Sequence, residues 1–383
     1  MRRRIFDADH EAFRDSVRAF LRAELVPHLP KWEADGQVGR DVWRRAGEAG
    51  LLGICVPEEF GGGGSSDVRY VFVRDEELAR VGTLSPAFNL HSEVVGGSIN
   101  RLGTPEQRKR WLPGICQGTV IGAMAVSEPG AGSDVAAIAT VARRDGAGYV
   151  LSGQKSYVTH ALLADIVVVL ARLEDTPGRK RTGPPRGVLL VVDLDAPGVH
   201  RGRAERTIGV HALDTVEVTF DDVVVPADRL LGEEGLGFVH LSETMLHERF
   251  SIAVTSLALA ERVFADTVEH CHTRHAFGGP LSALQHVRFT LAEMATELRV
   301  ARAFTDTCIE QFVNGEIAPE EVAMAKLWNT ELCGRITDRC LQLHGGVGYS
   351  ADGIVGRAFV DCRVERIYGG SSEVMKEIIG QSV

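Results

Sequence analysis

A glutamate within an apolar helical stripe is the first residue of this chain whose type and position predict chemistry. Leu241, Met245, Glu248 and Ile252 follow helical spacing, so they share one helix face. A carboxylate on such a face is partly removed from water, which raises its pKa toward the range that suits a general base. Because Arg249 follows directly, a structural Glu–Arg pair is the alternative interpretation.

Two glycine-rich segments could bring backbone close to a ligand. Residues 127–134 (SEPGAGSD) follow a β-branched run, and their hydroxyls and free amides can bind carbonyl or phosphate oxygens. Residues 342–349 (QLHGGVGY) place three glycines at the end of a predicted helix, which is more than a C-cap needs. An ordinary Ser/Gly/Asp turn and a packed or capping His344 are the alternatives.

A third segment, residues 154–159 (QKSYVT), combines Tyr157 and Thr159 on a predicted strand. The aromatic side chain can lie against a flat ring while the hydroxyl meets a ring nitrogen, although Tyr and Thr are also common strand residues without any ligand. The chain has no G-x-S-x-G elbow, P-loop, H-E-x-x-H motif or C-x-x-C pair. We therefore predict none of the chemistries tied to these motifs and no metal site.

The elements that must position these segments fall into three regions. The 383 residues suffice for two or three domains, and the hydrophobic period changes twice along the chain. Residues 1–119 have helical spacing, residues 120–232 contain short β-branched runs, and residues 233–383 return to a helical period. This order predicts an α+β protein with an N-terminal α-helical domain, a middle antiparallel β domain and a C-terminal antiparallel bundle, since no helix-length connection separates the strands.

Within these regions, the sequence predicts particular segments. The long helical segments of the bundle are 238–273, 284–314 and 320–343. Residues 176–186, rich in Pro, Gly and basic side chains, are predicted to form an exposed loop.

Charge and composition exclude several classes of protein. The 42 Lys+Arg and 52 Asp+Glu give a net charge of −10, which argues against nucleic acid as a partner, because phosphate contacts need a concentrated basic face. No uncharged apolar run approaches the roughly 20 residues of a membrane-spanning helix, and the basic residues 2–4 are not followed by the apolar segment of a secretory signal. The seven separated cysteines predict reduced thiols and a cytoplasmic location.

Taken together, these features resemble the acyl-CoA dehydrogenase family over nearly the whole chain. The two signature segments of the family match residues 126–134 and 342–361, and residues 274–278 with Gln285 resemble the segment that reaches the FAD of a neighbouring subunit. The resemblance implies an α domain, a β domain and a C-terminal four-helix bundle. It also implies FAD as cofactor and an acyl thioester as substrate.

The resemblance assigns roles to individual residues. Val126 and Ser127 would contact the flavin ring, Tyr157 would stack near it where the family usually has Trp, and Thr159 would bind flavin N5. The adenosine-diphosphate part of FAD would be held across a subunit interface by Arg274, Phe277, Gln285, Gln342 and Gly346, with Ser371 and Glu373 closing the site. The substrate site would contain Ser133, Arg249, Tyr368 and Gly370.

The position of the catalytic base differs from that in most of the family. Most members carry a Glu directly after the Tyr of a Tyr-Glu-Gly-Thr motif, but here Gly369 follows Tyr368, and glycine accepts no proton. The long-chain and isovaleryl subgroups share this gap and supply the Glu from a helix, in a pair like Glu248–Arg249. The resemblance thus implies that Glu248 removes the α-proton and flavin N5 takes the β-hydride, which leaves a trans-2-enoyl thioester. The Gly369 amide would bind the thioester carbonyl.

Several alternatives stay open at this point. The thioester could belong to an acyl-carrier protein of secondary metabolism rather than to CoA. The protein could also be an oxygen-using oxidase or monooxygenase of the same fold, or a non-catalytic acyl-thioester-binding protein. The family implies an electron-transferring flavoprotein as acceptor and a dimer or tetramer of identical chains.

Overall fold

The N-terminal region is helical, as predicted. The computed structural model describes residues 3–174 and 186–383, so the loop predicted at 176–186 lies, apart from Arg186, outside the described residues. The helices of this region are α1 (Ala8–Phe20), α2 (Leu29–Asp35), α3 (Asp41–Glu48), α4 (Arg69–Arg80), α5 (Gly97–Leu102) and α6 (Pro105–Cys116). Helix α6 begins at a capping box, in which Thr104 Oγ1 accepts from the Gln107 N–H and the Gln107 side chain accepts from the Thr104 N–H.

A single twisted sheet forms the middle region. Its strands are β1 (Gly122–Ala125), β2 (Val141–Asp145), β3 (Gly148–Thr159), β4 (Ile166–Leu173), β5 (Gly187–Asp193), β6 (Val199–Ala204), β7 (Thr215–Val225) and β8 (Leu230–Gly235). They are ordered β6-β7-β3-β2-β4-β5-β8, and β1 lies against β4. Strands β4 and β5 are almost continuously buried, as expected for sequences that are apolar except for Arg172 and Asp193.

The prediction of a wholly antiparallel sheet was wrong for two strand pairs. Both β1 and β2 run parallel to β4, whereas β2–β3, β3–β7, β4–β5, β5–β8 and β6–β7 are antiparallel. Parallel strands need a long connection, which is usually a helix. Here the β2–β3 hairpin supplies the length between β1 and β4, so the absence of connecting helices did not exclude parallel pairing.

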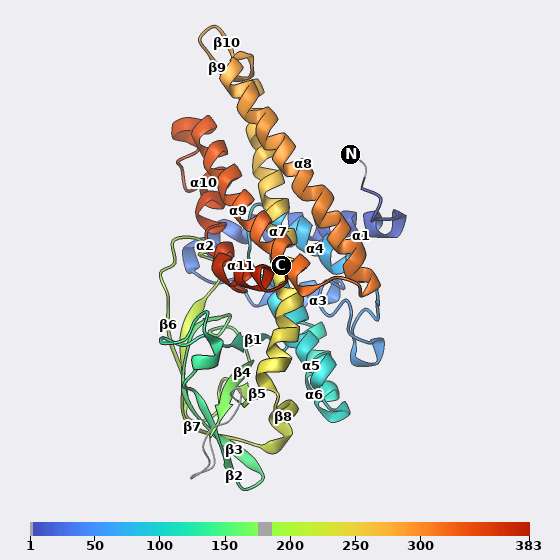
Figure 1. Cartoon of the computed structure of the whole chain (residues 1–383), viewed down its shortest axis with the longest axis vertical. Coiled ribbons are helices and arrows are strands. Elements are labelled where there is room, and N and C mark those ends of the chain that lie inside the picture. Colours follow the sequence, from blue (N-terminus) through green and yellow to red (C-terminus); the bar gives the residue numbers. More distant parts are fainter. Residues whose placement is uncertain (1–2, 175–185) are drawn as a thin grey trace.

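The C-terminal region consists of long helices joined by tight turns. Helices α7 (Gly237–Thr273), α8 (Gln285–Asn314) and α9 (Pro319–His344) each begin and end within one residue of the predicted segments. The short strands β9 (His275–Ala276) and β10 (Gly279–Pro280) form a hairpin between α7 and α8, at the end of the bundle far from the large sheet (Figure 1). The short helices α10 (Ile354–Asp361) and α11 (Ser372–Gly380) complete the region and contact α9.

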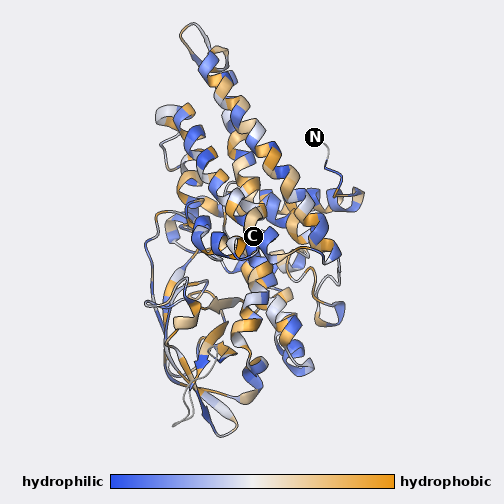
Figure 2. Ribbon diagram, viewed as in Figure 1, coloured by the Kyte–Doolittle hydropathy of each residue, from blue (hydrophilic) through white to orange (hydrophobic). Residues whose placement is uncertain are grey.

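Helix α7 connects the three regions. Its first turns lie beside the sheet and its later turns lie in the bundle, with N-terminal helix α4 against it (Figure 1). Hydrophobic and hydrophilic residues alternate along the long helices (Figure 2), which is the pattern of amphipathic helices that bury one face. In the part of the chain that the structure describes, no helix is long and apolar enough to cross a membrane.

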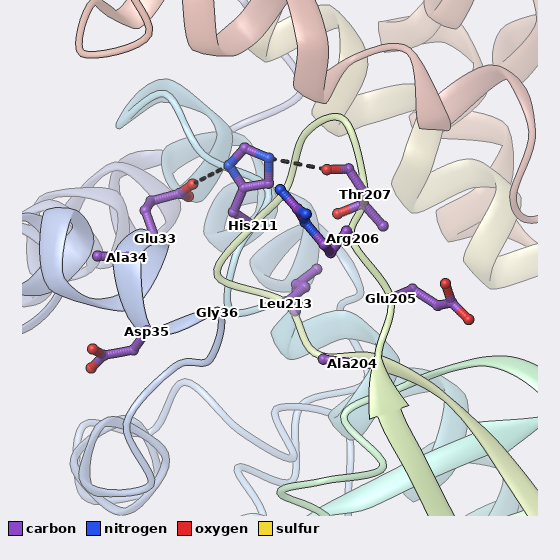
Figure 3. Close-up of a pocket in the computed structure, with 10 residues that line it drawn as sticks. All are labelled: Glu33, Ala34, Asp35, Gly36, Ala204, Glu205, Arg206, Thr207, His211 and Leu213. Carbon is purple, nitrogen blue, oxygen red and sulfur yellow. Dashed lines mark hydrogen bonds and ion pairs between the residues drawn. The ribbon is translucent and has the colours of Figure 1, made fainter.

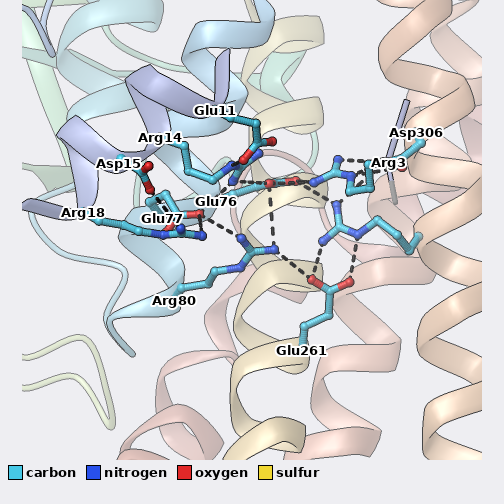
Figure 4. Close-up of polar contacts among 11 residues, drawn as sticks. Arg3, Glu11, Arg14, Asp15, Arg18, Glu76, Glu77, Arg80, Glu261 and Asp306 are labelled. Carbon is cyan, nitrogen blue, oxygen red and sulfur yellow. Dashed lines mark hydrogen bonds and ion pairs between the residues drawn. The ribbon is translucent and has the colours of Figure 1, made fainter. Parts of the chain in front are cut away.

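A buried charge network ties the N-terminal helices to the bundle (Figure 4). The Glu76 carboxylate on α4 has no exposed surface and accepts hydrogen bonds from Arg3 at 2.6 Å, Arg14 at 3.0 Å and Arg302 at 2.8 Å. Arg302 on α8 also binds Glu261 on α7 at 2.7 Å. Helices α1, α4 and α8 and the N-terminal segment therefore meet at one carboxylate, and α7 joins them through Arg302.

Candidate functional site

Helix α7 carries Glu248 to the junction of the three regions. The side chain is half-buried, and desolvation raises the pKa of the carboxyl to about 7, although the positive charges of Arg249 and Lys326 act in the opposite direction. A pKa near neutral lets this group accept a proton at physiological pH and release it again. The structural Glu–Arg pair considered above is not formed, since Arg249 donates its Nε–H to the Gly369 carbonyl at 3.0 Å.

The turn at Gly369 and Gly370 lies against Glu248. Both glycines have positive φ, at +64° and +102°, which residues with a side chain rarely adopt. A Cβ at position 369 would lie 3.9 Å from Glu248 Oε1 and 2.5 Å from Ile252 Cδ1, so Ile252 fills the space that a side chain there would need. Among the described residues, neither glycine N–H has a hydrogen-bond acceptor. This turn therefore presents free amide donors beside a carboxylate.

A buried ion pair lies beside the predicted flavin segment. Lys155 on β3 binds Glu128 at 2.7 Å and also donates to the Val126 carbonyl at 2.8 Å. The Ser156 N–H donates to the Ser127 carbonyl at 2.8 Å. These bonds fix residues 126–128 against β3. Sequence reasoning missed Lys155 and Glu128, because each reads as an ordinary polar residue of a strand or a turn.

A bulge turns Tyr157 outward at the same place. The pairing of β3 with β7 shifts register between Lys155 and Val158, and Tyr157 has φ +56° and is 70% exposed. Thr159 follows on the same strand and is half-buried. The structure thus brings the predicted flavin-ring residues of two segments, 126–127 and 157–159, side by side, where the Ser156–Ser127 hydrogen bond joins the segments.

The other predicted FAD residues lie at the opposite end of α7. Arg274 and Phe277 are on the hairpin between α7 and α8, and the Phe277 side chain is 93% exposed. Gln285 begins α8, while Gln342 and Gly346 lie at the end of α9, where the His270 and His344 rings stack at 4.1 Å. Within one chain, the β9–β10 hairpin lies far from strands β1 and β3 of the large sheet (Figure 1).

The remaining predicted residues lie near the 369–370 turn, except Ser133, which lies on a separate loop. Ser371 caps α11 by accepting from the Val374 N–H at 3.4 Å, and Glu373 is exposed in the first turn of that helix. Both follow the 369–370 turn directly, so they lie nearer to Glu248 than to the hairpin. Tyr368 is 38% exposed beside this turn, and Ser133 is exposed on the loop that contains Gly130 and Gly132.

The donor set on these surfaces fits FAD. Among the polar side chains predicted to hold FAD, those of Ser127, Tyr157, Thr159, Arg274, Gln285 and Gln342 make no hydrogen bond to another residue of the described chain. Polar, cationic and amide groups of this kind suit a ligand with a polar ring edge and a diphosphate. A Cβ added at Gly130, Gly132, Gly345 or Gly346 would meet no atom within 4 Å, so the backbone there is open to close approach.

Two cavities lie on the surface, one away from the predicted site residues and one beside residues 128–130. One of about 440 Å³ lies between α2 and the loop that precedes β7, where His211 Nδ1 lies 3.6 Å from Glu33 Oε2 (Figure 3). No predicted site residue lines it. The other, of about 590 Å³, is bordered by Glu128, Pro129 and Gly130 and by strands β3 and β7.

Comparison with known proteins agrees with this arrangement. Three family models match in order: the acyl-CoA dehydrogenase N-terminal domain at residues 7–119, the middle domain at 123–223 and the C-terminal domain at 235–383. This chain belongs to the acyl-CoA dehydrogenase family.

Individual relatives resemble it over most of their length. The mitochondrial long-chain specific acyl-CoA dehydrogenase of Mus musculus is 40% identical, with 100% of this chain and 88% of that protein covered. The crystal structure of an acyl-CoA dehydrogenase from Geobacillus kaustophilus is 41% identical with a TM-score of 0.95, covering 100% and 99% of the two chains. A glutaryl-CoA dehydrogenase from Mycobacterium smegmatis, solved in complex with FADH2, is 27% identical with a TM-score of 0.91, covering 99% and 95%.

Proposed function

We infer that this protein is an FAD-dependent acyl-CoA dehydrogenase that converts a saturated acyl-CoA to the trans-2-enoyl-CoA. One observation carries the proposal: a carboxyl group with a pKa near 7 faces a turn whose amide donors have no acceptor among the described residues. That pairing suits removal of a proton next to a carbonyl, because the base and the donors for the developing oxyanion stand side by side.

We assign the following roles to the residues of the chain. The Gly369 N–H polarises the thioester carbonyl, and Glu248 accepts the α-proton. Tyr368 and Gly370 border the acyl group, and Ser133 contacts the arm of the thioester. FAD, when bound, supplies the acceptor for the hydride from the β-carbon. Val126, Ser127, Tyr157 and Thr159 would hold its ring.

An anaerobic absorbance titration tests this function. We expect acyl-CoAs from butyryl-CoA to stearoyl-CoA to bleach the oxidised flavin band, and the chain length that bleaches at the lowest concentration defines the preferred substrate. A yellow protein that no acyl-CoA bleaches would overturn the proposal. In that case, bleaching by an acyl-carrier-protein thioester, or rapid reoxidation by air, would favour the corresponding alternative.

We further propose that the active protein is a homo-oligomer, a dimer or a tetramer, in which the hairpin of one chain completes the FAD site of another. The separation of the two groups of FAD residues within one chain supports this, as does the exposed Phe277. Sedimentation of the FAD-loaded protein tests it, and a monomer that retains FAD would contradict it. An electron-transferring flavoprotein is the proposed acceptor. The seven free cysteines, six of them buried, support a reducing cytoplasmic location.

A further inference from the structure

A buried lysine that sequence reasoning did not single out contacts the turn beside Glu248. Lys326 lies on α9, has no exposed surface, and donates from Nζ to the Gly370 carbonyl at 2.6 Å. Desolvation lowers the pKa of Lys326 to about 8, although the buried carboxyl of Glu365 acts in the opposite direction. Burying an ammonium group is costly. A buried lysine whose ammonium group binds a single backbone carbonyl therefore requires an explanation beyond packing.

The turn is held from two sides. Arg249 on α7 binds the Gly369 carbonyl at 3.0 Å, and Lys326 on α9 binds the next carbonyl along the chain. Two adjacent glycines would otherwise rotate freely. Because each peptide unit is planar, a carbonyl that is held in place also fixes the direction of the N–H in the same unit. The two cations thus fix the peptide units that contain the Gly370 and Ser371 N–H groups. They anchor the backbone on the C-terminal side of Gly369, whose own N–H belongs to the preceding unit and is separated from the first fixed unit only by the Gly369 Cα.

The charges around Lys326 come from three parts of the chain. Glu248 and Arg249 face it from α7, Glu331 from its own helix, and Glu365 from the segment after α10. Glu365 accepts a hydrogen bond from Thr255 at 3.4 Å, and its Oε2 has no partner among the described residues. The ammonium group therefore has no close ion pair in the described chain, and its one hydrogen bond is the contact with the turn.

We propose that Lys326 is a positioning residue for the reaction: with Arg249, it holds the 369–370 turn so that the Gly369 N–H is aimed at the substrate carbonyl. The inference rests on the proposed function. In the step concerned, the α C–H bond breaks, the proton goes to Glu248, and the electron pair forms the enolate, whose negative charge lies on the thioester oxygen. A fixed donor stabilises that charge better than a mobile one.

The test measures how strongly the FAD-loaded protein stabilises an enolate. Acetoacetyl-CoA has an acidic α-proton, and its bound enolate gives a long-wavelength absorption band next to oxidised flavin. The pH at which this band appears therefore reports the stabilisation of the oxyanion. We expect Lys326→Met to raise the apparent pKa of the bound ligand by at least about one unit, which is tenfold in the ionisation constant, and to lower kcat more than it changes KM. Lys326→Gln, which can still donate to Gly370, should lie in between.

Two controls separate positioning from other roles. Thr330→Val removes a buried hydroxyl one turn along α9 that binds only the backbone of its own helix, so it should leave the apparent pKa unchanged. The second control repeats the measurement in the Glu248→Gln background, in which the base is absent. The shift caused by Lys326→Met should persist in that background. If it disappears, Lys326 acts only by tuning Glu248 and the proposal fails.

Other outcomes are equally decisive. If Lys326→Met does not fold or loses FAD, Lys326→Gln carries the test, and wild-type values in that variant for both the ligand pKa and kcat would overturn the proposal. If the wild-type protein is not bleached by any acyl-CoA, the proposed function fails and this inference fails with it. If an acyl-CoA bleaches the wild-type protein and every Lys326 variant has the wild-type ligand pKa and kcat, only the positioning role is refuted.

Discussion

The Glu248→Gln variant is expected to keep its FAD and its fold but to lose turnover by about 10²–10⁴-fold, the range for removal of a general base. The amide has nearly the shape of the carboxyl, so packing on α7 is preserved, yet it cannot accept the α-proton. Single-turnover flavin reduction by an acyl-CoA measures the loss directly. The exposed Glu243 on the same helix is a matched control, and Glu243→Gln should reduce flavin at the wild-type rate.

The pH dependence of the wild-type protein follows from the same carboxyl. Desolvation raises the pKa of Glu248 to about 7, so the group is increasingly protonated below that pH. Only the ionised form can act as the base, and kcat/KM should therefore fall about tenfold per pH unit below pH 7 and level off above it. Full activity of Glu248→Gln, or a flat profile from pH 5 to pH 8, would contradict the assignment of the base.

The second large effect is expected at the buried charge network, where Glu76→Gln should destabilise the protein by about 3–5 kcal/mol. The carboxylate binds Arg3, Arg14 and Arg302 in the absence of water (Figure 4), and its removal leaves these cations without their shared partner. Desolvation alone would raise the pKa of Glu76, but the surrounding arginines, Arg302 foremost, lower it well below its usual range. The network is therefore fully charged at neutral pH.

Urea unfolding at pH 7 measures this effect, with the FAD content held constant. Asp15→Asn is the control, because Asp15 pairs with Arg18 at the surface, and exposed pairs contribute less than about 1 kcal/mol. The unfolding midpoint should fall strongly for Glu76→Gln and hardly at all for Asp15→Asn. Equal midpoints for the two variants would show that the network does not link the N-terminal helices to the bundle.

Local sequence determined much of this protein. The period of apolar residues located α7, α8 and α9 to within one residue, because an amphipathic helix must repeat its buried positions every three or four residues. The glycine-rich segments and the carboxylate of Glu248 within an apolar stripe were likewise visible. In each case, the information lies in residues that are close along the chain.

Only the tertiary structure decided the strand pairings and side-chain contacts that join residues far apart along the chain. The parallel pairing of β1 with β4 joins strands about 40 residues apart, and no local pattern specifies it. The same holds for the contacts of Lys155 with Glu128 and of Lys326 with Gly370, which join side chains and backbone 27 and 44 positions apart. A buried lysine looks like any other lysine in a sequence. Only the folded chain shows which of them has been removed from water, and what it binds there.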